Sequence, residues 1–296
     1  MTDTAVIVLT AALTGTACAL LGPFLVLRRV ALLGDAVSHA VLPGIVLVWL
    51  VAQTRAPLAV VAGAALFAVV CVLAIDALRA TGLVPPDAAI GLVFPALFSL
   101  GVLGVTRYAD GIHLDLDSTI YGEIAFVPFA TVTVAGVPLA RATVVLAVVV
   151  AVNLALVGLL WKELKATTFD PEFSRTVGLR PVLLSRLLLL AVAVTAVSAF
   201  EAVGAILVVT LLIVPAATAY LLTDRLAVMV AVAVAVSWVG AVAGNALATA
   251  TDSAISGAMG LACTACFVLA LLAAPRHGLV VRWIRRGRRR RPAAAA

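Results

Sequence analysis

An aspartate and a histidine, four residues apart, interrupt an apolar stretch near the start of the chain. Asp35 and His39 lie in RRVALLGDAVSHAVLPG, residues 28–44, and on a helix this spacing places both side chains on one face. A carboxylate and an imidazole together suit a divalent metal such as Mn(II), Fe(II) or Zn(II). The pair could instead be a hydrogen-bonded tie between two helices, or a proton relay, because histidine titrates near neutral pH. The residues alone leave these three hypotheses open.

Glu201 is a second acidic candidate, in SAFEAVGAILVVTLLIVPAATAY. It lies at the expected outer end of an apolar segment, where it would be either a solvated helix end or a group at an external entrance. His113 belongs to a polar stretch, residues 107–118, that could attract cations or simply be a solvated loop. Cys263 and Cys266 have the spacing of a metal or redox pair, but in an apolar helix small side chains favour close packing.

The elements that must position these side chains are membrane helices. Of the 296 residues, 65% are hydrophobic and 11% are charged, and the mean hydropathy is +1.24, whereas soluble domains are roughly 45–50% apolar. About 20 apolar residues cross the hydrocarbon core as a helix. We therefore predict an all-α, polytopic membrane helix bundle. A charge inside it costs roughly 2.5–3.5 kcal/mol unless it is paired, faces a cavity or serves a pathway.

The apolar pattern predicts nine spans, with the N-terminus outside and the C-terminus inside. Cytoplasmic loops collect Lys and Arg, and this rule places residues 28–29, 162–180, Arg225 and 282–291 in the cytoplasm. Residues 119–140 are apolar but contain Gly and Pro, which favours a re-entrant or surface-lying segment. That segment leaves totals of eight or ten open. The predicted spans are 5–27, 30–50, 57–78, 88–105, 142–160, 183–199, 202–222, 226–248 and 254–274.

The longest polar insertion, residues 161–181, is predicted to lie in the cytoplasm. Asp170 before Pro171 is a helix-start signal and Gly178 is a helix-stop signal, so we expect a short helix at the membrane surface. Such a helix could bind a partner protein, although an ordinary connecting loop is the alternative. The run RWIRRGRRRR, residues 282–291, holds much of the net charge of +6. Beside a last span it indicates the cytoplasmic side and anionic lipid rather than nucleic acid.

Two sequence motifs of enzymes are absent. Lys162 and Lys165 are the only lysines, and neither belongs to a GxxxxGK[ST] phosphate loop, so the chain cannot bind ATP by that motif. The chain also lacks the HExxH motif of zinc proteases. We therefore expect a chain without enzymatic activity of its own and without a permanently bound cofactor.

Six blocks of the sequence resemble, in order, the permease subunits of bacterial ATP-binding-cassette importers for manganese, zinc and iron. The match runs from about residue 20 to 279, and GDAVSHAVLPG and LLIVPAATAYLLTDR are its specific signals. The blocks are RRVALLGDAVSHAVLPG, PPDAAIGLVFPALFSLGV, HLDLDSTIYGEIAFVP, KELKATTFDPEFSRTVGL, AVGAILVVTLLIVPAATAYLLTDR and FVLALLAAPRHGL.

The resemblance implies a type II importer-like permease in the bacterial plasma membrane, with residues 1–281 as the transmembrane domain and 282–296 as a basic, disordered cytoplasmic tail. It also implies three partners: a cytoplasmic ATPase that binds the ATP, an extracytoplasmic solute-binding protein or lipoprotein, and a second permease, identical or a sister chain. The resemblance favours manganese as the transported metal, with zinc as the next candidate and iron as the third. A proton-coupled secondary metal transporter and a non-transporting membrane scaffold are the rival functions, and neither explains a cytoplasmic docking segment.

The resemblance implies roles for individual residues at matching positions. Asp35 and His39 match the family's metal site in the membrane, and Glu201 stands where members vary among Gln, Asp and Glu. Asp87 matches an acidic family position to which we assign no role, and the two prolines before it depart from the basic and acidic residues usual there. The segment that docks on the ATPase contributes Phe169, Asp170, Pro171, Glu172 and Gly178.

Overall fold

A computed structural model describes residues 3–30, 32–52, 57–108, 124–134 and 136–274 of the chain. In these ranges nine helices are long and apolar enough to cross a membrane, which confirms the predicted number. His113 and the predicted tail, 282–296, lie outside the described residues. The nine helices are α1 (Asp3–Leu27), α2 (Leu33–Ala52), α3 (Pro57–Ala80), α4 (Pro86–Tyr108), α6 (Arg141–Leu159), α9 (Pro181–Val203), α10 (Ala205–Leu222), α11 (Leu226–Thr251) and α12 (Ile255–Ala273).

Proline begins several of these helices. Pro57, Pro86 and Pro181 are the first residues of α3, α4 and α9, where a fixed φ suits the helix and the missing N–H has no intrahelical partner to lose. The observed helix ends differ by only a few residues from those predicted by hydropathy.

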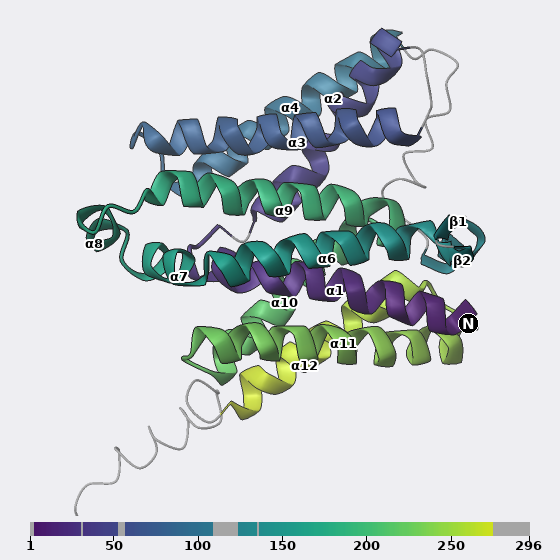
Figure 1. Ribbon diagram of the computed structural model, residues 1–296. Coiled ribbons are helices and arrows are strands. Elements are labelled where there is room, and N and C mark those ends of the chain that lie inside the picture. Colours follow the sequence, from purple (N-terminus) through teal and green to yellow (C-terminus); the bar gives the residue numbers. More distant parts are fainter. Residues whose placement is uncertain (1–2, 31, 53–56, 109–123, 135, 275–296) are drawn as a thin grey trace, which may run out of the picture.

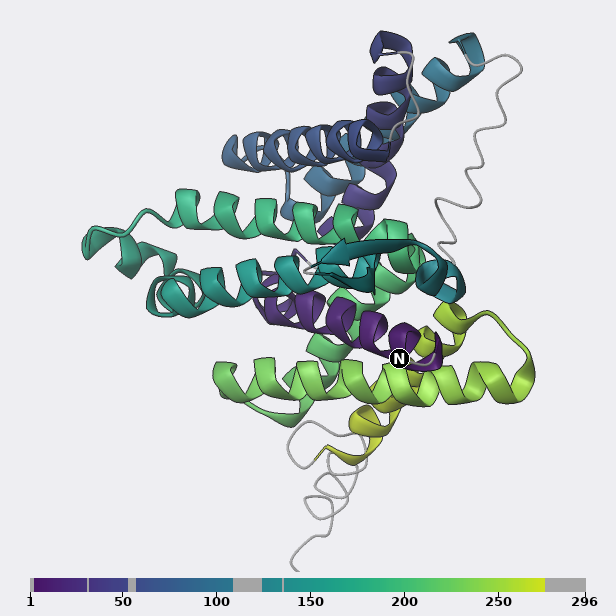
Figure 2. The same cartoon turned by 45° about the vertical axis from the view of Figure 1, so that its right-hand side comes forward.

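The spans form three groups (Figures 1 and 2). Helices α2, α3 and α4 pack on one another, α1, α6 and α9 lie in the middle, and α10, α11 and α12 make up the third group. Helix α1 contacts α6, α9, α10 and α11 and is the most buried span. A helix that is apolar on all sides needs such a central position.

Glycines set the closest approach between helices of the first group. Gly44 of α2 lies against Gly63 of α3, and a Cβ added to either would overlap the carbonyl oxygen of the other. Small residues at helix interfaces are typical of membrane bundles, where packing and not hydrophobic burial drives association. This contact holds α2 and α3 together.

The two ends of the bundle carry different small elements. At one end lie the 3₁₀ helix η1 (Ile124–Phe129) and an antiparallel hairpin of β1 (Thr131–Val134) and β2 (Val137–Ala140), in which Thr131 pairs with Ala140. The N-terminus lies at this end, and α7 (Trp161–Phe169) and α8 (Pro171–Thr176) lie at the other (Figure 1). The described part of the segment 119–140 thus adds no span, and the N-terminus and the polar insertion lie at opposite ends, as the predicted topology requires.

Candidate metal site and coupling segment

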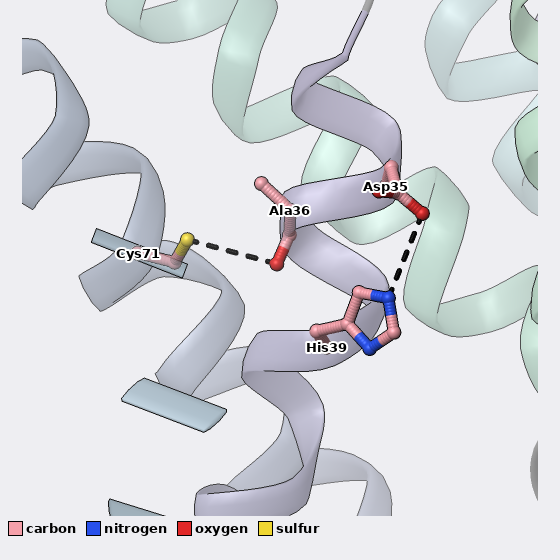
Figure 3. A network of polar contacts seen from close by, with 4 residues as sticks. All are labelled: Asp35, Ala36, His39 and Cys71. Atoms are coloured by element: carbon pink, nitrogen blue, oxygen red, sulfur yellow. Dashed lines mark hydrogen bonds and ion pairs between the residues drawn. The ribbon is translucent and has the colours of Figure 1, made fainter. Parts of the chain in front are cut away.

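Helix α2 positions the charged pair that the sequence singled out. The Nε2 of His39 lies 3.7 Å from the Oδ1 of Asp35, on one face of the helix (Figure 3). Asp35 occupies the first helical turn, where the helix dipole favours a negative charge. In the single chain the two side chains are 45% and 46% exposed, so about half of each remains uncovered by its own bundle. At membrane depth such a pair requires a cavity or a second protein surface.

Two aromatic rings of α4 contact the imidazole. The ring of His39 stacks on Phe94, with centroids 5.6 Å apart and an interplanar angle of 27°. It meets Phe98 edge-on, at 5.5 Å and 79°. These contacts restrict the orientation of the imidazole. The two phenylalanines were not predicted as site residues, and an available signal was their spacing of four, which equals that of Asp35 and His39.

The opposite side of α2 packs against α3. The Sγ of Cys71 lies 3.9 Å from the carbonyl oxygen of Ala36 (Figure 3), and Ala36, Val37 and Ala40 are fully buried. Pro43 lies inside α2 and cannot donate to the carbonyl of His39, four residues earlier, so the helix is weakened just beyond the pair. Helix α2 therefore buries small apolar residues against its neighbours and leaves the charged pair half-exposed.

The described part of the chain holds no group of three or more His, Cys, Asp or Glu side chains placed to bind a metal. Glu201 lies in the last turn of α9, but its side chain is outside what the structure describes. Cys263 and Cys266 are free thiols, and Cys263 packs so closely on Gly240 of α11 that a Cβ there would overlap its Sγ. That contact supports the packing interpretation of the cysteines. One chain thus offers one carboxylate and one imidazole at α2.

Helix α8 forms where the sequence predicts a short helix, and capping residues define both of its ends. The Oδ1 of Asp170 accepts a hydrogen bond of 2.9 Å from the N–H of Phe173, which satisfies a free donor of the first turn. At the other end Gly178 has φ +83°, and the N–H of Leu179 donates to the carbonyl of Ser174 at 3.0 Å. This is the Schellman arrangement, in which glycine takes the left-handed conformation.

The coupling segment, α7 and α8 together with residues 177–180, exposes apolar side chains. Phe169, Phe173 and Val177 are 58%, 61% and 61% exposed, and Pro171 and Glu172 are exposed beside them. Contiguous exposed apolar groups rimmed by polar ones mark protein contact sites. In Figure 1, α8 projects beyond the ends of the neighbouring helices.

Arg28 fixes the coupling segment to the end of α1. Its Nε donates to the Oγ1 of Thr168 at 3.0 Å and its Nη2 donates to the Oγ1 of Thr167 at 3.1 Å. Burial, together with the charge of Arg79, lowers the pKa of Arg28 to about 10. The guanidinium therefore remains charged at neutral pH, and the tether joins the coupling segment to the most buried span.

A second ion pair joins α3 to α9 and was not predicted. The Nε of Arg186 donates to the Oδ2 of Asp76 at 2.7 Å, and Asp76 is 14% exposed. The signal was an acidic residue inside the predicted span 57–78. Since α9 follows the coupling segment directly, this pair connects that segment to the group of helices that carries Asp35 and His39.

Comparisons with known proteins agree over almost the whole chain. The sequence profile described as the ABC 3 transport family matches residues 3–274. The manganese transport system membrane protein MntD of Bacillus subtilis is 40% identical over 280 residues, which cover 94% of this chain and 95% of that protein. The zinc transport system membrane protein TroD of Treponema pallidum is 42% identical over 276 residues, covering 93% and 75%.

A solved structure shares the fold. A chain of PsaBC from Streptococcus pneumoniae, solved in complex with Fab, superimposes with a TM-score of 0.77 at 25% sequence identity. The match covers 97% of this chain and 96% of that chain. The overall fold is therefore common to the two proteins.

Proposed function

The chain belongs to the ABC 3 transport family, and we propose that its Asp35 and His39 bind a divalent metal ion as the ion crosses the membrane. Manganese is the favoured metal. The chain is a multi-pass permease subunit of a bacterial ABC importer for transition metals. The observation that carries the proposal is the half-exposed pair on α2, with its Nε2 and Oδ1 3.7 Å apart. A mixed nitrogen and oxygen donor set suits Mn(II), Zn(II) and Fe(II).

The names of the relatives support manganese first and zinc second. The relative that matches over 95% of its own length is named for manganese, and the one that matches over 75% is named for zinc. A site made of carboxylate and imidazole ligands would bind Zn(II) more tightly than Mn(II), as most sites do. Selection for manganese would then depend on the delivering solute-binding protein and on geometry.

A second permease completes the ligand set. Two donors from one chain leave most coordination positions of the metal open, whereas a two-fold axis beside α2 would bring in two more. The partner would be an identical copy or a sister chain, and its surface would cover the half-exposed Asp35 and His39. Four protein donors that meet only in the dimer can also release the metal when the subunits move.

The coupling segment is proposed to dock on a cytoplasmic ATPase, with the exposed Phe169, Phe173 and Val177 as the apolar contact. Closure of two ATPase subunits around ATP would displace this segment. The displacement would reach the bundle through Arg28 and through the pair of Asp76 and Arg186. The second connection joins α9 directly to α3, and α9 also contacts α2.

Transport in proteoliposomes tests this proposal. We would reconstitute the chain with its ATPase and solute-binding protein and compare uptake of Mn(II), Zn(II) and Fe(II) by the parent, His39→Ala and a control, Leu47→Ala, on the same helix. We expect ATP-dependent uptake in the parent and the control, and its loss in His39→Ala while ATP is still hydrolysed. Uptake that persists in His39→Ala would reduce the pair to a structural role. Uptake driven by a proton gradient without ATP would make the chain a secondary transporter.

A further inference from the structure

A pocket rich in arginine lies at the end of the bundle that carries the coupling segment. Its volume is about 530 Å³, and its walls come from the ends of α1 and α3, from α7 and α8, and from the first residues of α9. Four of the lining residues are arginines: Arg28, Arg29, Arg79 and Arg175. The mechanism proposed above uses only the first of them, as a tether.

The positive charge of this pocket is not neutralised by its own lining. Asp76 is the acidic lining residue, and it already binds Arg186 at 2.7 Å. Within the described ranges, no carboxylate forms an ion pair with Arg28 or Arg79. Arg28 donates its two hydrogen bonds to the hydroxyls of Thr167 and Thr168. Arg79 is close enough for its charge to lower the pKa of Arg28. Two arginines that repel each other in a partly buried pocket favour an anion between them.

The donors of the pocket suit a phosphate group. Guanidinium groups bind phosphate oxygens through paired N–H donors, and Ser185 adds a hydroxyl to the lining. Apolar side chains stand next to these donors, namely Leu27, Val84 and Val182. Val182 is 49% exposed and its neighbour Leu183 is 51% exposed. A ligand with a phosphate and an adjoining apolar part would contact both kinds of wall.

The pocket also lies at the depth where lipid phosphates lie. Arg28 follows the last residue of α1, Arg79 is in the last turn of α3, and Pro181 begins α9. These are the points at which the spans leave the hydrocarbon core for the headgroup region. Basic pockets between membrane helices on the cytoplasmic side are typical sites for anionic lipid headgroups.

We propose that this pocket binds the phosphate of an anionic phospholipid of the inner leaflet, and that the lipid braces the coupling segment against the bundle. The phosphate lies among Arg28, Arg79 and Arg175, which come from three different elements. Lipid bound there joins α8 to the ends of α1 and α3. The inference does not depend on which metal is transported or on the role of Asp35 and His39.

Retention of lipid tests the proposal. The permease and its ATPase would be placed in nanodiscs of phosphatidylcholine with a minor fraction of phosphatidylglycerol, and native mass spectrometry would count the phosphatidylglycerol that stays bound. The variants are Arg79→Gln and Arg175→Gln, and the matched control is Arg225→Gln, a basic residue before α11 that does not line the pocket. We expect retention to fall about fivefold for each pocket arginine removed and to stay unchanged in the control.

Three outcomes would overturn the proposal. Equal retention in the parent and both pocket variants would mean that the lipid binds elsewhere. Displacement of the lipid by millimolar inorganic phosphate would identify a site for free anions instead. Loss of the ATPase from the complex with retention of lipid would show that the pocket binds an acidic group of that subunit. Arg175 is exposed on α8, so its variant keeps the test valid if Arg79→Gln fails to fold.

Discussion

His39 has neighbours on two helices, and together they restrict the orientation of its ring. Asp35 approaches Nε2 from the same helix, while Phe94 and Phe98 contact the ring from α4. A metal ligand held by packing keeps its geometry at little entropic cost. Phe94 and Phe98 would therefore hold the imidazole in place at the proposed site, which would also involve α4.

Replacing Phe94 by Leu tests this positioning at the level of one residue. The imidazole would lose its stacked partner and sample other orientations, so we expect the KM for metal uptake to rise about tenfold. ATP hydrolysis should be unchanged. Initial uptake rates over a range of Mn(II) concentrations measure the effect. Phe126→Leu, an exposed aromatic change on η1, is the control, and equal KM values in the two variants would contradict the positioning role.

The carboxylate of Asp35 is expected to matter through its charge. Asp35→Asn preserves the shape of the side chain but removes the anionic ligand, and the amide oxygen is a weaker donor to a divalent cation. We expect metal uptake to fall at least tenfold. Uptake in proteoliposomes at saturating ATP measures this loss. Asp35→Glu, which keeps the charge, should retain part of the uptake. Equal loss of uptake in Asp35→Asn and Asp35→Glu would point to a structural role for Asp35.

Among the secondary-structure elements, α8 is too short to be stable through its own hydrogen bonds and depends on its caps. Asp170→Ala removes the N-cap, which typically costs about 1 kcal/mol, and Gly178→Ala places a side chain at φ +83°, which costs roughly 1–2 kcal/mol. In both variants we expect ATP hydrolysis to continue while metal uptake falls. Thr176→Ala, on the exposed side of α8, is the control. Normal uptake per ATP in the two cap variants would show that α8 does not transmit the movement.

The pair of Asp76 and Arg186 is expected to stabilise the contact between α3 and α9. Asp76 is the more buried partner, so Arg186→Gln leaves a poorly solvated carboxylate and should lower the Tm more than Asp76→Asn. A hydrogen bond to a charged group contributes roughly 1.5–3 kcal/mol, and exposure of Arg186 places this pair near the lower end. Thermal unfolding of both single variants and the double variant, as a double-mutant cycle, measures the coupling. Additive effects would show that the two side chains do not act together.

Considered as a whole molecule, the chain places its charged pair on an outer face. Helices α2, α3 and α4 form one side of the bundle in both views (Figures 1 and 2), and Asp35 and His39 on α2 are half-exposed. Within the described residues they do not belong to a group of three or more His, Cys, Asp or Glu side chains. A second permease packed beside α2 would supply the missing ligands and remove the pair from lipid.

Cysteine cross-linking tests this assembly. The background carries Cys266→Ser, which removes the more accessible native thiol. In it, His39→Cys should form disulfide-linked dimers with an oxidant when the second permease carries a cysteine at the same position. Val239→Cys, exposed on α11 at the other side of the bundle, should remain monomeric. Gel electrophoresis under non-reducing conditions separates the two. Dimers from Val239→Cys alone would place the interface at α11 and leave Asp35 and His39 outside it.

Local sequence was enough to determine the spans, the caps of α8 and the shared face of Asp35 and His39. Each depends on a few neighbouring residues: about 20 apolar residues for a span, Asp170 and Gly178 for a short helix, and a spacing of four for a common face. For the same reason the resemblance to metal importers could be recognised from contiguous blocks such as GDAVSHAVLPG.

Only the tertiary structure decided which helices share contacts. It placed Phe94 and Phe98 on His39, joined Asp76 to Arg186 and gathered Arg28, Arg79 and Arg175 around one pocket. These groups are far apart in the sequence, and nearly uniform hydrophobicity around each span carries little information about which neighbour it meets. Helix packing settles that choice through the fit of small residues such as Gly44 and Gly63, whose partner lies on another helix.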